Sequence, residues 1–156
     1  MKILVLYFLL VFLLISDCIA QKLEMKFFPA SLTNSISIFS CNGDSCGIQF
    51  NIYDHDDSSK IIWSESKRIP SDIFKEFELF MKDVENLCDK NVFGFDGITI
   101  KGKYFDTTGI KQFKFWSPLK RTRKYELFKM TIGTLRKYME SKNSKAYLRR
   151  LKSYLD

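Results

Sequence analysis

The sequence predicts an α+β domain, with a five-stranded, mainly antiparallel sheet and helices packed on one face, in the order βββ-α-ββ-α-α. Three observations lead to this prediction. Short β-rich runs joined by polar, glycine-bearing turns come first, apolar residues then recur at helical spacing, and a second hairpin pattern precedes two more helical stretches. An antiparallel sheet with one covered face is the simplest packing of elements in that order.

The first twenty residues are expected to be a secretory signal peptide, which leaves residues 21–156 as a single domain. Residues 3–15 are apolar and uncharged, and small residues follow at Cys18 and Ala20. This is the pattern of a cleaved leader, and the run is too short to span a bilayer. We therefore expect export to the periplasm or the extracellular space, with no transmembrane segment after cleavage. The alternative is a membrane-anchored lipoprotein acylated on Cys18, although Asp17 fits a lipobox poorly.

The first three strands are predicted over residues 35–41, 46–54 and 60–68, which are rich in β-branched and aromatic side chains. The polar segments NGDS and DHDDSS separate them and predict consecutive hairpins. The second segment contains His55, the only histidine, among three aspartates. Clustered carboxylates attract hard cations, but this spacing matches no calcium-loop pattern. We interpret it as a solvated turn and expect neither a metal site nor a cofactor.

A disulfide between Cys41 and Cys46 is expected, because a two-residue turn at Gly43 and Asp44 would place these cysteines opposite each other in an exported protein. The hydrophobic pattern favours a different pairing. A one-residue shift brings all the apolar side chains of the hairpin to one face but separates the cysteines. The side chains that would align are Ile36, Ile38, Ile48, Phe50 and Ile52.

An amphipathic helix is predicted after Pro70, with Ser71 as its N-cap. Its apolar stripe recurs at spacings of three and four residues. The stripe consists of Ile73, Phe77, Phe80, Val84 and Leu87. Cys88, at its end, is expected to be a buried free thiol.

A second hairpin is predicted from residue 97 to residue 117, turning at DTTG. If Phe105 faces Ile110, then Gly102 lies opposite Phe113, and an aromatic ring above a strand glycine is a stabilising pair. The aromatic rings then face the core. The outer face carries Lys101, Lys103, Lys114 and Trp116. A nucleic-acid platform needs several aromatic rings beside its positive charges, so we expect no specific nucleic-acid binding.

Residues 95–118, with the pattern FDGITIKG…FKFWSP, resemble a pattern in small uncharacterised bacterial exported α+β proteins. The resemblance implies a hairpin with Asp96 and Gly97 at the turn into its first strand. It implies no activity.

Two helices are expected to close the chain, and this half is strongly basic. The apolar positions are Tyr125, Phe128, Ile132, Leu135 and Met139 in the first helix and Tyr147, Leu148, Leu151 and Leu155 in the second. Residues 101–156 carry 16 basic and 4 acidic side chains, whereas residues 21–100 carry 8 basic and 13 acidic ones. A basic region favours an anionic partner, here an acidic protein or an anionic envelope surface.

Two clusters are candidates for anion binding. We favour the run after Pro118, which packs four charges into five residues, over the outer face of the second hairpin. The run consists of Lys120, Arg121, Arg123 and Lys124, and the hairpin face of Lys101, Lys103 and Lys114 with Trp116 beside them.

No catalytic motif is present in the sequence: there is no G-x-S-x-G elbow, glycine-rich phosphate loop or histidine-rich metal motif. The expected function is therefore that of an exported, non-enzymatic binding or interaction protein of the bacterial envelope. One alternative is a hydrolase that acts on an envelope polymer through a carboxylate pair. A second is a weak binder of anionic lipid or polymer through the basic half. The carboxylates of the hydrolase would come from Asp54, Asp56, Asp96 and Asp106.

Overall fold

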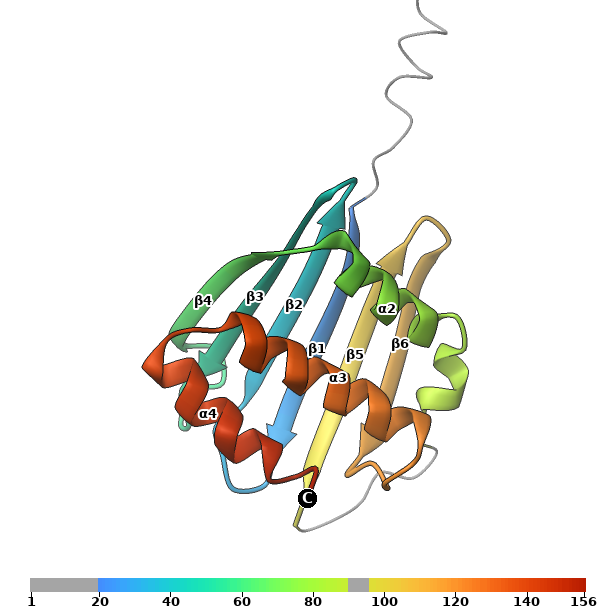
Figure 1. Ribbon diagram of the computed structural model, residues 1–156. Coiled ribbons are helices and arrows are strands. Elements are labelled where there is room, and N and C mark those ends of the chain that lie inside the picture. The colour runs from blue at the N-terminus through green and yellow to red at the C-terminus, as the bar shows by residue number, and fades with distance from the viewer. Residues whose placement is uncertain (1–19, 90–95) are drawn as a thin grey trace, which may run out of the picture.

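The computed structural model describes residues 20–89 and 96–156. They form one antiparallel sheet with the strand order β4-β3-β2-β1-β5-β6 (Figure 1). The α+β class and the antiparallel sheet are confirmed, but the sheet has six strands rather than five. The strands are β1 (Gln21–Pro29), β2 (Ser35–Asn42), β3 (Ser45–Tyr53), β4 (Ile61–Ile69), β5 (Ile98–Asp106) and β6 (Gly109–Trp116).

The strand that the sequence prediction missed is β1, and it lies near the centre of the sheet between β2 and β5. Its side chains alternate, with Leu23, Met25 and Phe27 fully buried on one face and Lys26 exposed on the other. This strand joins the two hairpins, which otherwise share no strand pairing. It therefore decides which side chains of the second hairpin lie beside those of the first.

The helices cover one face of the sheet (Figure 1). They are α2 (Ser71–Met81), the short 3-10 helix η1 (Val84–Leu87), α3 (Arg123–Tyr138) and α4 (Lys142–Lys152). Their apolar stripes pack on this face in a single hydrophobic cluster to which every strand contributes, although β4 contributes only Ile69 and the half-buried Trp63. In α3 and α4 the expected apolar positions are buried, apart from the half-buried Tyr125.

The predicted first helix is shorter than its apolar spacing suggested. It ends at Met81, and the last two apolar positions belong to η1. Ser71 is the first helical residue rather than the N-cap, because Pro70 takes the cap position without a side-chain hydrogen bond. Cys88 is free, as expected, but exposed rather than buried, because the chain leaves the helical layer there and runs beside β6.

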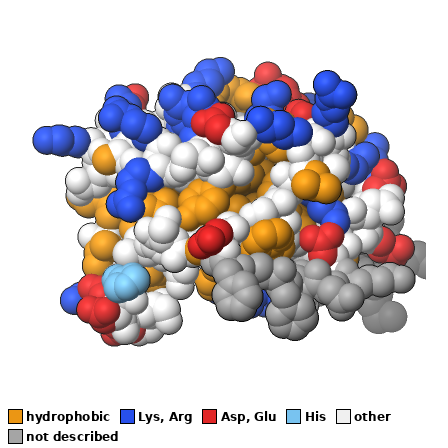
Figure 2. Space-filling view, turned by 90° about the horizontal axis from the view of Figure 1, so that it is seen from below, with side chains coloured by type: hydrophobic (Ala, Val, Ile, Leu, Met, Phe, Trp, Pro, Cys, Tyr) orange, Lys and Arg blue, Asp and Glu red, His pale blue; other side chains and the backbone are white. Residues whose placement is uncertain are grey.

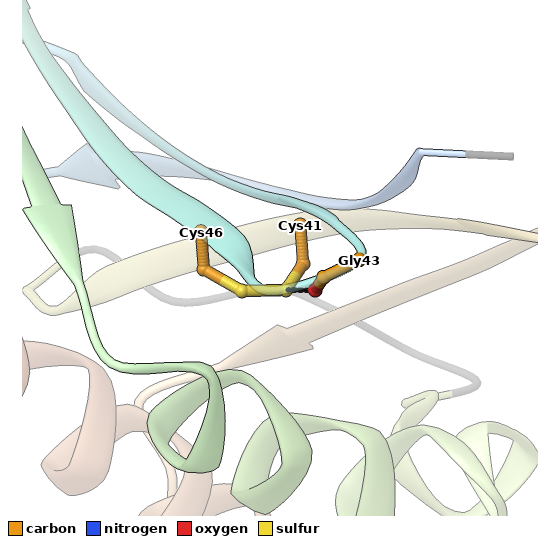
Figure 3. The surroundings of a disulfide bond; sticks show 3 residues. All are labelled: Cys41, Gly43 and Cys46. Carbon is orange, nitrogen blue, oxygen red and sulfur yellow. Dashed lines mark hydrogen bonds between the residues drawn. A yellow bond between two sulfur atoms is a disulfide. The ribbon is translucent and has the colours of Figure 1, made fainter. Parts of the chain in front are cut away.

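Cys41 and Cys46 form the expected disulfide across the β2–β3 turn (Figure 3). The turn residue Gly43 has a φ of 58°, a conformation that glycine adopts without strain. In this register Ile36 and Ile38 point away from the helices, and small serines take the core positions between them and before them. The cysteine register, not the register that aligns all the apolar side chains, is therefore the one that the chain adopts.

The register predicted for the second hairpin is confirmed. Phe105 pairs with Ile110, and Gly102 pairs with Phe113. A Cβ atom at Gly102 would lie only 1.9 Å from the ring of Phe113, so the ring fills the space above the glycine. The loop itself is a two-residue turn, since Asp106 and Gly109 already pair.

Glu65 of β4 fixes the start of α4. Its carboxylate accepts hydrogen bonds from the hydroxyls of Ser141 (2.5 Å) and Ser144 (2.6 Å) and from the N–H of Glu140 (2.7 Å). Burial alone would raise the pKa of Glu65, but these hydrogen bonds outweigh it and lower the pKa to about 2. The carboxylate thus holds Ser141, the N-cap of α4, whose hydroxyl oxygen accepts from the N–H of Ser144 at 3.1 Å.

Candidate anion-binding face

None of the described helices lies on the second face of the sheet, which we call the open face (Figure 1). Its chemistry differs between the two ends of the sheet. Strands β2, β3 and β4 present serine, asparagine and glutamine side chains there together with Ile36 and Ile38, whereas β1, β5 and β6 present five lysines and one glutamate. The lysines are Lys22, Lys26, Lys101, Lys103 and Lys114.

Three of these lysines form a line across three adjacent strands. Lys26 of β1 lies directly opposite Lys101 of β5, and Lys101 lies directly opposite Lys114 of β6. We call these residues the lysine row. All three are exposed, and none makes an ion pair with a described residue. Neighbouring strands lie about 4.8 Å apart, so the backbones of the three lysines in the row lie within roughly 10 Å of one another.

The next line across the same strands is mixed in charge. Glu24 lies opposite Lys103, and Lys103 lies opposite Gln112. Glu24 is already engaged, because it forms a 2.6 Å ion pair with Lys22 on its own strand. Glu24 therefore does not neutralise the positive charge of the neighbouring Lys103 and of the lysine row.

A groove of about 470 Å³ lies over the lysine row. Its walls include all three lysines of the row together with Glu24, Lys103 and Gln112. Phe28 lines it at one side, and Cys88 lines it from beyond the edge of β6. The thiol of Cys88 donates to the carbonyl of Gln112 at 3.7 Å.

Aromatic side chains also lie on the basic half of the open face, more of them than the sequence prediction counted. Phe28 comes from the missed strand β1, and Phe105 joins Trp116 from the second hairpin. All three rings have neighbours already. The ammonium of Lys101 lies 4.9 Å from the centre of the Phe28 ring, that of Lys22 lies 5.6 Å from Phe105, and the Trp116 ring packs against Gly97.

The run that the sequence analysis favoured for anion binding is divided between two roles. Lys120 and Arg121 are exposed in the loop before α3. Arg123 instead donates to the carbonyl of Leu79 at 2.6 Å, and Lys124 pairs with Asp89. These two side chains tie the start of α3 to α2 and to the segment beside β6, so their charges are used within the fold.

Positive charge is not confined to the open face. Figure 2 shows lysine and arginine side chains gathered over the helical layer at the end of the molecule that it displays. Along α4, the side chains of Lys142, Lys145 and Lys152 are exposed and form no ion pair with a described residue. At about 100° per residue these three lysines lie on the same side of α4, but none of them lines either groove on the open face.

The four aspartates considered for a hydrolase do not come together in a groove of the described residues. Asp54 and Asp106 shape turns, and none of the four lines either groove on the open face. The N–H of Asp56 donates to Asp54 at 2.9 Å, and this hydrogen bond lowers the pKa of Asp54. The Thr108 hydroxyl has the same effect on the pKa of Asp106. Within the described residues, no three His, Cys, Asp or Glu side chains gather as metal ligands would.

Comparison with known proteins yields no relative from which a function can be transferred. No protein-family model matches the chain, and no curated protein sequence is significantly similar to it. In the described part of the chain, no helix is both long enough and apolar enough to cross a membrane.

Proposed function

We propose that this protein is an exported, non-enzymatic binding protein that holds an anionic ligand on the basic half of its open face. The lysine row is the observation that carries the proposal. Like charges directly opposite each other on neighbouring strands destabilise a sheet, and Lys101 faces a lysine on both sides. A bound anion removes this repulsion, so the row is best explained as one half of a complex.

The groove over the row defines what kind of anionic ligand fits. It lies above three strands and is lined by lysines from each of them. A narrow chain with repeated negative charges reaches its floor and meets all three lysines, whereas a flat bilayer rests on its rim. Among the anionic partners expected from the sequence, an acidic polymer therefore fits better than a lipid surface.

Export is supported by the disulfide between Cys41 and Cys46, since such bonds persist in oxidising compartments. Amino-terminal sequencing of the protein recovered outside the cytoplasm should begin at Gln21. Recovery of a lipid-modified Cys18 as the first residue would instead show an anchored protein and would overturn this part of the proposal.

The binding proposal is tested with inorganic polyphosphate as a simple linear polyanion. The variant K26Q/K101Q/K114Q removes the lysine row, and K142Q/K145Q/K152Q removes the same charge from the exposed side of α4. We expect the first variant to bind polyphosphate much more weakly than the wild type at low salt, and the second to resemble the wild type. Wild-type binding should also weaken as salt rises to physiological concentration, because the Debye length shortens to about 8 Å.

A third variant, K120Q/R121Q, tests the exposed part of the run before α3. If that run is the binding site, this variant loses affinity and the lysine-row variant does not. Equal losses in the lysine-row and α4 variants would show that only net charge matters, and the open-face site would then be refuted.

A further inference from the structure

A second groove, of about 350 Å³, lies on the same open face over β2, β3 and β4. Its lining consists of Ile38, Ser40, Gly47, Ile48, Gln49, Ser66, Lys67 and Arg68. The side chains of Ser40, Gln49, Ser66 and Arg68 are exposed, so their hydroxyl, amide and guanidinium groups are available to a ligand. The first groove thus supplies positive charge. The second supplies neutral hydrogen-bonding groups beside the apolar Ile38, with Arg68 as a further cation, whereas its other cation, Lys67, is paired with Glu140.

The two grooves are connected by the strand register. Glu24 of β1, which lines the first groove, lies directly opposite Ile38 of β2, which lines the second, and this line of paired residues continues through Gln49 of β3 to Ser66 of β4. On the neighbouring line, Gly47 has no side chain to stand between Ser40 and Arg68. A chain that leaves the lysine row therefore passes Glu24 and Ile38 before it reaches the hydrogen-bonding groups of the second groove.

Hydrogen bonds order the Gln49 side chain, which lines the second groove. The amide of Gln49 donates to Asn51 Oδ1 at 3.2 Å, and the hydroxyl of Ser64 donates to the same oxygen at 2.7 Å. These hydrogen bonds hold the Gln49 side chain in place, and its amide oxygen and second N–H face no described partner. A ligand rich in hydroxyl groups matches such amide and hydroxyl groups, because hydroxyls both donate and accept.

We infer that the ligand is a linear anionic polysaccharide that lies across the strands from β6 to β4. Its carboxylate or sulfate groups contact the lysine row, and its sugar hydroxyls contact the groups of the second groove, with a further acidic group at Arg68. This inference rests on the proposed function, since it extends the ligand of the lysine row over the rest of the open face.

A single-stranded nucleic acid fits the face less well. Bases are bound by stacking on exposed aromatic rings. The rings of Phe28, Phe105 and Trp116 are half-buried, and each already has a neighbour: Lys101 at Phe28, Lys22 at Phe105 and Gly97 at Trp116. The half of the face beyond β1 offers hydroxyls and amides in the groove instead of rings.

The span of the site sets the length of chain that reaches both grooves. Lys114 and Arg68 lie on the two outermost strands, five strand spacings apart. At about 4.8 Å per spacing, the ligand must cover at least roughly 24 Å. A disaccharide is shorter than this span, and a long oligosaccharide exceeds it.

The test measures the affinity of the purified protein for oligogalacturonates and sulfated oligosaccharides of increasing length, with polyphosphate and oligo-dT of similar charge as comparisons. The variants are K26Q/K101Q/K114Q for the first groove and Q49A/R68Q for the second, each checked for a single cooperative thermal unfolding transition. We expect Q49A/R68Q to lose roughly tenfold in affinity for the long anionic sugar chain, the worth of one charged hydrogen bond. Its affinity for the disaccharide and for polyphosphate should stay at the wild-type value.

The outcomes separate this inference from the proposed function. If the lysine-row variant loses all polyanion binding while Q49A/R68Q binds long sugar chains like the wild type, the proposed function stands and the polysaccharide inference fails. The inference also fails if neither anionic sugar binds, or if oligo-dT binds more tightly than both. If the lysine-row variant still binds every polyanion, the proposed function itself is refuted.

Discussion

The change Lys101→Glu should stabilise the fold while abolishing the anion binding that we propose. Lys101 faces Lys26 on one side and Lys114 on the other, so a carboxylate there converts two repulsive pairs into two attractive ones. Cross-strand charge pairs are worth about 0.2–1 kcal/mol each, and losing the contact with the Phe28 ring costs about 0.5–1 kcal/mol. The net expectation is a gain of roughly 0.5–1 kcal/mol in the free energy of unfolding.

The matched control is Lys103→Glu, two residues further along the same face of β5. It makes the same change of charge, but Lys103 lies opposite Glu24 and Gln112. A carboxylate there faces another carboxylate, so this variant should be less stable than the wild type by about 0.2–1 kcal/mol. Both variants should bind polyphosphate more weakly than the wild type.

Urea unfolding at low salt measures the two stability changes, and repeating it at high salt should shrink both because exposed charges are screened. The reasoning requires opposite signs for the two variants. If both variants destabilise the protein equally, or if the stability difference between them is unaffected by salt, then repulsion between Lys101 and its two lysine neighbours does not lower the stability of the wild type.

Three further predictions concern the fold. Gly102→Ala should destabilise the protein by about 1–3 kcal/mol, because the added Cβ would overlap the Phe113 ring. In contrast, a Cβ at Gly133 meets no atom within 4 Å, so Gly133→Ala should stabilise α3 by about 0.5–1 kcal/mol. Thermal or urea unfolding of the two variants measures both changes. Glu65→Gln should cost about 1–2 kcal/mol at pH 7, allowing for partial exposure of the carboxylate. The pKa of Glu65 in the folded protein, about 2, lies below the ordinary value of 4.5. The stability difference between the variant and the wild type should therefore disappear as the pH falls from about 4.5 to about 2. A stability difference that does not change with pH would contradict the hydrogen-bonding role of the Glu65 carboxylate. Thiol counting on the denatured protein after leader removal should find one free cysteine, Cys88, whereas three would show that the first hairpin lacks its disulfide.

Much of the fold was readable from local patterns. The second hairpin was predicted in its correct register because the DTTG turn sets Phe105 opposite Ile110, and the resulting pair of Gly102 with Phe113 supports that pairing. The last two helices followed from their apolar spacing. The strand β1 was missed although Leu23, Met25 and Phe27 alternate with charged residues, a spacing typical of a half-buried strand. The first helix was predicted too long because its apolar spacing continues past Met81, where the chain tightens into η1.

The candidate site was only half predictable. Lys101, Lys103, Lys114 and Trp116 were found because they share one face of a local hairpin, whose alternation is visible in the sequence. Lys26 was missed with its strand, and its place beside Lys101 depends on a pairing between segments about 75 residues apart.

The basic run before α3 was overvalued for a similar reason. Nothing local indicates that Arg123 pairs with Asp83, or Lys124 with Asp89, since these partners lie in the preceding helical region. Tertiary contacts of this kind decide whether a cluster of charges is free for a ligand, and the sequence spacing does not contain them.

The central claim is that the open face over β1, β5 and β6 is where the protein binds anions. The most direct measurement is to follow the backbone amide signals of the isotope-labelled protein by NMR during a polyphosphate titration at low salt. The account predicts the largest chemical-shift changes at Lys26, Lys101, Lys103 and Lys114, with the outer side of α3 and α4 little affected. Changes concentrated on the helical layer, or at residues 120–124, with the lysine row unchanged, would contradict it.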